Sequence, residues 1–511
     1  MSILLLLLAA APLAEAFAPP RFVAPHHAAR LGPIRARAAH NNLATAKEEP
    51  PLTAATAAPP LQPTLVQWAK TESSAIAPCA VFYVLYNTLR KVLTRLGVSF
   101  PASIVGMLAG FGVLCAIRAW RTEAADRVER FFSPACRLFR AWLAAIFAPG
   151  LITLPLVMPS LPASELAAFF AIVAGGFATS LTTGALVATA LAPRSSSGSS
   201  SSGSLTGSVV PTAPLPSLPA VSPPAEPYVP FPRSQQRFFV LTAALCLGVH
   251  VASGTAALAM LRTALFSSGR LLNIGLLAVT LGSFSLASTY CSKQLQLWVH
   301  PFLQCSAATL LACAGVGALS GEGYRAVLSS YATSGGGAWL SQLLGPCVVS
   351  FSLQLYAYRR PLMERSVQIV GSAVLSTFLS MLSSAFVARL CGLSRVLRLA
   401  LLSRTTTTAL AGEIGRLLGV APALGLLAAF ITALVAFALG KPLLARLGVT
   451  DPVVRGLAMS STAHGGAVVS MSDEPEAFPF AVLMMNLAAA AAVLLLSLQP
   501  VRALLLAVAG A

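Results

Sequence analysis

Two short polar segments interrupt the most apolar part of this chain. Residues 404–408 read Arg-Thr-Thr-Thr-Thr, and residues 460–466 read Ser-Ser-Thr-Ala-His-Gly-Gly, with an apolar run at 421–439 between them. Guanidinium, imidazole and hydroxyl groups are costly in hydrocarbon and usually line the path of a ligand or an ion. We therefore expect the two segments, together with Glu413 and Arg455, to form such a path beside one membrane span.

The composition indicates a membrane protein. Hydrophobic residues make up 56% of the 511 residues and charged residues only 10%, whereas a soluble domain has about 25% charged residues. Many apolar runs reach the length of about 20 residues that crosses the hydrocarbon as a helix, without the alternation of a barrel strand. We expect an all-α fold, a polytopic transmembrane helical bundle with about twelve spans.

The excess of positive charge does not indicate nucleic-acid binding. The chain carries 34 Lys and Arg against 16 Asp and Glu, a formal charge of +18, but the excess lies in Arg-rich loops and a basic leader, as the positive-inside rule predicts. No RNA- or DNA-binding motif accompanies it. The nine cysteines are scattered without a C-x-x-C spacing, so neither a zinc site nor a disulfide framework is predicted. We expect no metal and no cofactor.

The beginning of the chain is typical of a two-part targeting leader. Residues 1–16 are Leu-rich and end in small residues, which predicts a signal peptide. Residues 17–50 are basic and rich in Ala and Pro, with no acidic residue before Glu48, which is the composition of a transit peptide. The pair resembles the leaders of algae with secondary plastids, and a secreted or surface membrane protein is the alternative. Residues 51–75 follow as a spacer.

Two membrane modules follow, joined by a linker. Residues 76–192 form the first module, with an Arg-rich loop before its third helix. Its expected helices are at 77–92, 101–119, 142–158 and 166–191. Residues 193–236 are rich in Ser, Gly and Pro, and we expect a disordered linker there.

Residues 237–511 form the second module. Its longer expected helices are at 239–261, 272–290, 302–319, 339–357, 367–388, 422–439 and 478–498. The elements around Arg404 and His464 are shorter and rich in Ser, Thr and Gly, which predicts interrupted or re-entrant helices. Asp451 and Pro452 are suited to the start of the helix that carries His464.

Several motifs of the second module resemble a known membrane protein family. They are Tyr331-x3-Gly335, Leu343-Leu344-Gly345-Pro346-Cys347, the 404–408 run with Ala411-x-Glu413, Leu418-Gly419-x2-Pro422, Asp451-Pro452-x2-Arg455-Gly456 and Ala463-His464-Gly465. These motifs resemble the LrgB (CidB) family, and Phe100-Pro101-Ala102-Ser103 in the first module resembles its LrgA (CidA) partner. The fusion of both with a plastid leader is similar to the plastid glycolate/glycerate translocators. The family's Lys-Ser-x-Thr-Thr-Pro is replaced here by residues 404–409.

The resemblance implies a secondary transporter that moves glycolate, glycerate or similar small 2-hydroxycarboxylates across the plastid inner envelope, as in photorespiration. Proton symport and exchange are both open, and so is a homo-oligomer. A cation can hold the carboxylate of such an anion with paired hydrogen bonds, and hydroxyls and helix N-termini add donors. The expected substrate-binding residues are Arg404, Thr405, Thr407, Thr408, Arg455, Ser460, Ser461 and His464. His464 and Glu413 are the candidates for proton coupling.

Each of these residues also has a structural explanation. Arg404 can be an ordinary basic flank at the membrane surface, and the four threonines at 405–408 can hydrogen-bond their own helix backbone. Asp451 can be only a helix cap, and Glu474 can belong to a solvated acidic loop.

Two other classes of function compete with transport. A holin-like pore or regulatory membrane protein of the LrgA/LrgB type is the alternative, and the plastid leader argues against it. An enzyme is not expected, because the chain shows neither H-E-x-x-H nor a recognisable nucleophile and base.

Overall fold

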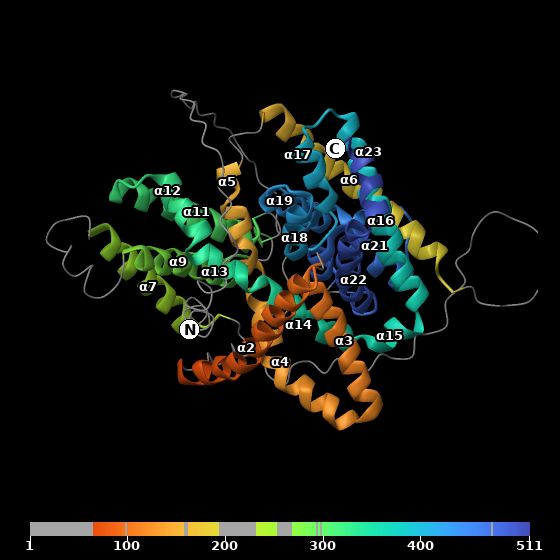
Figure 1. The fold of residues 1–511 in the computed structure, drawn as a ribbon, viewed down its shortest axis with the longest axis horizontal. Coiled ribbons are helices and arrows are strands. Elements are labelled where there is room, and N and C mark those ends of the chain that lie inside the picture. Colours follow the sequence, from red (N-terminus) through yellow and green to blue (C-terminus); the bar gives the residue numbers. More distant parts are fainter. Residues whose placement is uncertain are drawn as a thin grey trace, which may run out of the picture.

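The computed structural model describes residues 65–97, 100–157, 162–193, 231–252, 268–292, 295–296, 299–471 and 474–510. Within these residues, ten helices are long and apolar enough to cross a membrane (Figure 1). The prediction of a polytopic helical bundle is thus confirmed. The predicted signal and transit peptides, the spacer up to residue 64 and linker residues 194–230 lie outside the described part.

The helices of the first half are α2 (Leu65–Arg95), α3 (Ala102–Trp120), α4 (Thr122–Ile152), α5 (Leu154–Val157) and α6 (Ala163–Ala190). The next group comprises α7 (Arg233–Ala252), α9 (Ser268–Tyr290), α11 (Pro301–Ser320), α12 (Tyr324–Thr333), α13 (Gly336–Gln342), α14 (Leu344–Ala357), α15 (Arg359–Glu364) and α16 (Ser366–Leu390). The last group comprises α17 (Arg395–Ala400), η2 (Leu401–Ser403), α18 (Thr408–Leu418), α19 (Pro422–Val435), η3 (Ala436–Gly440), α20 (Lys441–Arg446), α21 (Pro452–Ser470), α22 (Phe478–Ser497) and α23 (Gln499–Ala509).

The Arg-rich segment that we expected to be a loop is helical. The chain bends at Arg121, where the backbone is extended, and α4 begins at Thr122 and continues through the basic residues to Ile152. The prediction of a loop was wrong because this stretch is rich in Ala, Arg and Glu, which are strong helix formers. The end of the predicted spacer is also helical, since α2 begins at Leu65.

Helices of the first half pack between helices of the second half. Helix α3 packs on α14, α4 on α11, and α6 on α16, α19 and α21. In Figure 1, α6 lies beside α16, apart from α2 and α3. Nearly every side chain of α22 is buried, and α16 and α21 pack against it. The core of the bundle therefore lies around α22.

The chain reverses direction between α17 and α18. Residues 404–407 are not helical and join η2 to α18. The Ser403 hydroxyl and the Ala411 carbonyl lie 2.5 and 3.2 Å from the point that a Cβ on Gly425 would occupy. One straight helix would place Ser403 and Ala411 about 12 Å apart. Residues 395–418 therefore form a hairpin, the first hairpin, with residues 404–407 at its tip.

A second reversal occurs within α21. The backbone at His464 takes the left-handed φ of 38° with ψ −113°, which breaks the helix. Arg455 Nη2 and Nε each lie 2.8 Å from a carboxylate oxygen of Glu474. A continuous helix would separate these residues by about 28 Å, beyond the reach of two side chains. Residues 452–477 thus form the second hairpin, with His464 at its tip. Both hairpins confirm the predicted interruptions.

The second hairpin depends on the ion pair that closes its base. Arg455, with Lys441 at 3.5 Å, holds the pKa of the Glu474 carboxyl below its usual range. The stability from this pair is present above the unfolded-state pKa, near 4.5, and is lost as the pH falls through the lower folded-state value. At neutral pH, we expect Glu474→Gln in detergent to lose about 1.5–3 kcal/mol of stability, the contribution of a hydrogen bond to a charged group.

Thermal unfolding followed at several pH values measures this loss. The difference from the wild type should shrink below about pH 4, where the wild-type carboxyl also becomes neutral. Glu476→Gln is the matched control, since Glu476 is exposed on the same turn. Equal melting temperatures for Glu474→Gln and the wild type at pH 7 would contradict a closing role for the pair.

Candidate functional site

Arg404 is buried at the tip of the first hairpin. Only 1% of its surface is exposed, so it is not a basic flank at the membrane surface. Its Nε donates to Ser384 Oγ at 2.7 Å and its Nη2 to Ser180 Oγ at 2.6 Å, with Ser380 Oγ at 3.4 Å. Its Nη1 has no hydrogen-bond partner. The guanidinium is thus fixed by hydroxyls along one edge and has an unused donor group on the other.

The tips of the two hairpins touch. The His464 imidazole hydrogen-bonds the backbone of Arg404. The Arg404 N–H already donates to the Leu401 carbonyl, so the acceptor is the Arg404 carbonyl. His464 Nε2 has no partner, which leaves Nδ1 as the donor. A neutral imidazole that donates through Nδ1 carries a lone pair on Nε2. The imidazole therefore offers a buried acceptor.

The backbone of His464 is strained. A positive φ is uncommon for residues other than glycine and costs of the order of 1–3 kcal/mol. The hydrogen bond to Arg404 and the Ser460 hydroxyl, which donates to the His464 carbonyl at 3.3 Å, hold this conformation. The strain directs the imidazole from one hairpin tip to the other, and such strain is typical of functional sites.

The predicted hydroxyls divide into two groups. Thr407 Oγ1 is buried and has no partner, although Thr407 precedes the first residue of α18. Ser460 and Ser461 donate to the carbonyls of His464 and Ala458, at 3.3 and 2.8 Å. Thr405 is buried and Thr408 half-buried on the same tip. Thr407 therefore offers a buried hydroxyl that is free to donate to a ligand.

The charge of Arg404 is only partly compensated. Taking an ion out of water costs several kcal/mol in real proteins, and the serine hydroxyls that bond the guanidinium are neutral and leave its charge without a counter-ion. Among the described residues, no carboxylate pairs with Arg404, whose environment acts on it through burial alone. A small anion placed against Nη1 would neutralise the charge and use both idle N–H groups.

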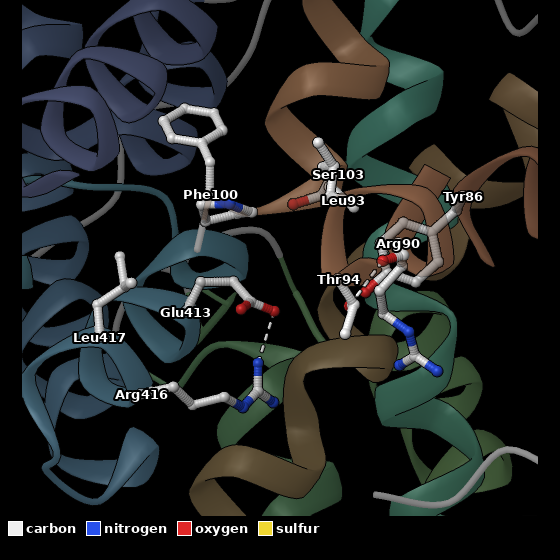
Figure 2. Close-up of a pocket in the computed structure, with 11 residues that line it drawn as sticks. Tyr86, Arg90, Leu93, Thr94, Phe100, Ser103, Glu413, Arg416 and Leu417 are labelled. Atoms are coloured by element: carbon white, nitrogen blue, oxygen red, sulfur yellow. Dashed lines mark hydrogen bonds and ion pairs between the residues drawn. The ribbon is translucent and has the colours of Figure 1, made fainter. Parts of the chain in front are cut away.

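Two of the predicted site residues lie elsewhere. The Arg455 guanidinium is occupied by Glu474 and the Val449 carbonyl. Glu413 pairs with Arg416 at 2.5 Å, and Figure 2 shows the two side chains facing each other across a dashed line. They line a pocket of about 270 Å³ between α18 and the α2–α3 corner. Neither residue joins the Arg404–His464 cluster, which consists of these two residues, Thr407 and the serines that bond the Arg404 guanidinium.

Three serines of the cluster were not predicted. Ser180 lies on α6 and Ser380 and Ser384 on α16, and all three are buried. The sequence carried one signal, since Ser372, Ser376, Ser380 and Ser384 recur every four residues and so share one helix face. Small polar residues on one face of a membrane helix indicate close packing. Ser180 had no such signal. Within the described residues, no group of His, Cys, Asp and Glu suited to a metal is found.

Comparisons with known proteins point to one family. The LrgB-like family model matches residues 280–500, which contain both hairpins. The plastidal glycolate/glycerate translocator 1 of Arabidopsis thaliana is 30% identical over 429 residues, which cover 83% of this chain and 78% of the relative.

Two bacterial relatives are similar over shorter stretches. The antiholin-like protein LrgB of Bacillus cereus is 31% identical over 144 residues, 28% of this chain and 63% of that protein. The uncharacterized protein YwbG of Bacillus subtilis is 27% identical over 130 residues, 25% of this chain and 58% of that protein. No solved structure matches the chain.

Replacing the buried cation by a neutral side chain tests whether the Arg404 site is built for a ligand. We expect Arg404→Met to keep or raise the melting temperature in the absence of any anion, because it removes an uncompensated buried charge. The serines retain partners, since Ser180 and Ser380 bond each other at 2.7 Å and Ser384 bonds the Ser380 carbonyl at 2.6 Å. A melting temperature lowered as much as by a core deletion such as Leu424→Ala would mean that Arg404 holds the fold together.

Proposed function

The chain belongs to the LrgB-like family, and from this premise we propose that it is a secondary transporter of small 2-hydroxycarboxylates such as glycolate and glycerate. The name of the Arabidopsis relative supports the substrate class and a plastid membrane. The two-part leader expected from residues 1–50 supports the inner envelope of a plastid, and its signal-peptide part supports a secondary plastid.

The buried Arg404 guanidinium is the observation on which this proposal rests. Interrupted helices that meet within the bundle and present polar groups to an anion are a recurrent solution in secondary transporters. Here the two hairpin tips carry the Arg404 Nη1 group, the Thr407 hydroxyl and the lone pair on His464 Nε2, none of which has a hydrogen-bond partner. These groups match the carboxylate and the hydroxyl of one small molecule.

The tautomer of His464 gives a reason to prefer a 2-hydroxy acid. The carboxylate accepts from Arg404 Nη1 and Thr407 Oγ1, and the substrate hydroxyl donates to His464 Nε2. A buried acceptor left without a donor costs about 1–3 kcal/mol. A carboxylate without a hydroxyl, such as acetate, leaves Nε2 unpaired and therefore binds more weakly.

The charge balance of the site favours exchange over net transport. With a monocarboxylate bound, the Arg404 site is a neutral pair, whereas the empty site carries a bare cation. Moving an uncompensated charge through a low-dielectric barrier costs several kcal/mol, so the loaded protein changes its orientation more readily than the empty one. Proton symport through His464 would add a second positive charge beside Arg404, and Glu413 is already paired with Arg416. We therefore assign glycolate–glycerate exchange.

The pocket in Figure 2 supports an access path. It lies beside Glu413 and Arg416 on the α18 arm of the first hairpin, and the same arm begins at Thr408 next to the tip. The eight residues from Thr408 to Arg416 span about 12 Å of helix, so an anion attracted by Arg416 and Arg90 arrives about two helical turns from Thr408, the residue next to the tip.

Counterflow in liposomes tests the transport mode. Vesicles preloaded with unlabelled D-glycerate should take up labelled glycolate at least about tenfold faster than empty vesicles, the ratio that corresponds to 1.4 kcal/mol in the barrier. Arg404→Gln should abolish uptake in both, while Arg395→Gln should leave it unchanged because Arg395 is exposed on the same hairpin. Passage of uncharged solutes of similar size through the wild type would instead favour the holin-like pore. Equal uptake in loaded and empty vesicles would overturn exchange.

A comparison of glycolate with acetate tests the role of the imidazole. We expect the wild type to prefer glycolate by about tenfold or more in KM, since 1–3 kcal/mol separates a paired from an unpaired buried acceptor. His464→Ala should weaken glycolate binding and bring the ratio close to one. Arg416→Gln should raise both KM values together and keep the ratio. A ratio that survives in His464→Ala would show that another group recognises the hydroxyl.

A further inference from the structure

Helix α6 comes from the first half of the chain, yet it lies against the substrate site of the second half. It packs on α16, α19 and α21. Gln368 of α16 donates to the Ala188 carbonyl of α6 at 2.9 Å, and Ser180 of α6 bonds Ser380 of α16 at 2.7 Å. These contacts tie α6 to the helix that carries two of the hydroxyls around Arg404.

One face of α6 meets the two hairpin tips directly. A Cβ on Gly176 would lie 2.9 Å from Arg404 Cζ and 3.0 Å from Nη2. One turn further on, the Ser180 hydroxyl accepts from Nη2 at 2.6 Å. One more turn along the helix, Gly184 is so close to Ser461 and the Ala458 backbone that no side chain fits between them. Helix α6 thus presents to the hairpin tips a glycine at 176, a hydroxyl at Ser180 and a second glycine at 184.

The Arg404 guanidinium is held between a helix from the first half of the chain and a helix from the second half. Ser384 on α16 fixes Nε, and Ser180 on α6 fixes Nη2. Two fixed donors on a planar guanidinium determine its orientation, and the direction in which the idle Nη1 points follows from them. If Ser180 is lost, the guanidinium keeps only one short hydrogen bond and can rotate.

We infer that α6 is a part of the anion site, with Ser180 as a positioning residue that aims Arg404 Nη1 at the carboxylate and Gly176 as the surface that lets the guanidinium lie flat. This inference rests on the proposed function for its substrate. It gives the first half of the chain a direct task in substrate binding.

Single substitutions on α6 in the full-length protein test this inference. Ser180→Ala should raise the KM for glycolate about tenfold or more, the effect of losing a 1.5–3 kcal/mol hydrogen bond to a charged group. Gly176→Ala should have a similar effect because the added methyl displaces the guanidinium. In both, the maximal rate should change much less than KM, since the site is misaligned but remains present.

Two neighbours on the same helix are matched controls. Gly175→Ala adds the same methyl where nothing lies within 4 Å, and Thr182→Ala removes a hydroxyl that bonds the Ala178 carbonyl of its own helix. Both should keep the wild-type KM. Unchanged KM values in Ser180→Ala and Gly176→Ala would overturn the inference and leave the proposed function intact.

A binding readout separates failure of this inference from failure of the proposed function. The rise in melting temperature with glycolate, D-glycerate, acetate and pyruvate is measured for the wild type and the four variants. If acetate or pyruvate stabilises the wild type but neither hydroxy acid does, the proposed substrate is wrong and the inference is judged from the loss of that stabilisation in Ser180→Ala and Gly176→Ala. If none of the four anions stabilises the wild type or is transported by it, both the inference about α6 and the proposed function are overturned.

Discussion

The functional site is arranged around one uncompensated charge inside an apolar bundle. Arg404 is 1% exposed, and among the described residues its guanidinium hydrogen-bonds to hydroxyls alone. A buried ion with one idle donor edge is destabilising unless an anion joins it. Proteins retain such a feature where function requires it, since replacing buried charges by apolar groups is often neutral or stabilising. The serines, the glycines of α6 and the hairpin tips are all arranged around this charge.

Two chain reversals make this arrangement compatible with a membrane. An irregular backbone at membrane depth is tolerated only where it is buried in protein or lines a cavity. Both tips satisfy this condition, because Arg404 and His464 are buried in the protein. The hydrogen bond from His464 to the Arg404 carbonyl joins the two tips, so the cation and the acceptor are held in one frame. The Arg455–Glu474 pair closes the base of one hairpin, and Asp451 begins it by accepting from the Val453 N–H at 2.8 Å.

The sequence was informative where a residue conflicts with its surroundings and uninformative where the partner is distant. Arg404 and His464 could be selected because cations and imidazoles are rare in apolar runs, and the neighbouring Gly and Thr residues predicted broken helices. Ser180 could not be selected, since a serine in an apolar helix has no local signature and its partner is 224 positions away. Arg455 looked like a ligand because nothing local shows that Glu474 returns to it. The pairing of Glu413 with Arg416 was readable from their i,i+3 spacing.

The same charge balance limits which acids fit the proposed transporter. One guanidinium neutralises one carboxylate, and no second free cation accompanies Arg404 in the described part of the site, because Arg455 is occupied by Glu474. A dicarboxylate would bring an unpaired negative charge into the bundle and meet a penalty of several kcal/mol. A second hydroxyl, as in glycerate, adds only a neutral group, which the hydroxyls of the hairpin tips can satisfy. Discrimination between mono- and dicarboxylates thus follows from the number of buried charges, whereas discrimination among monocarboxylates follows from the acceptor on His464.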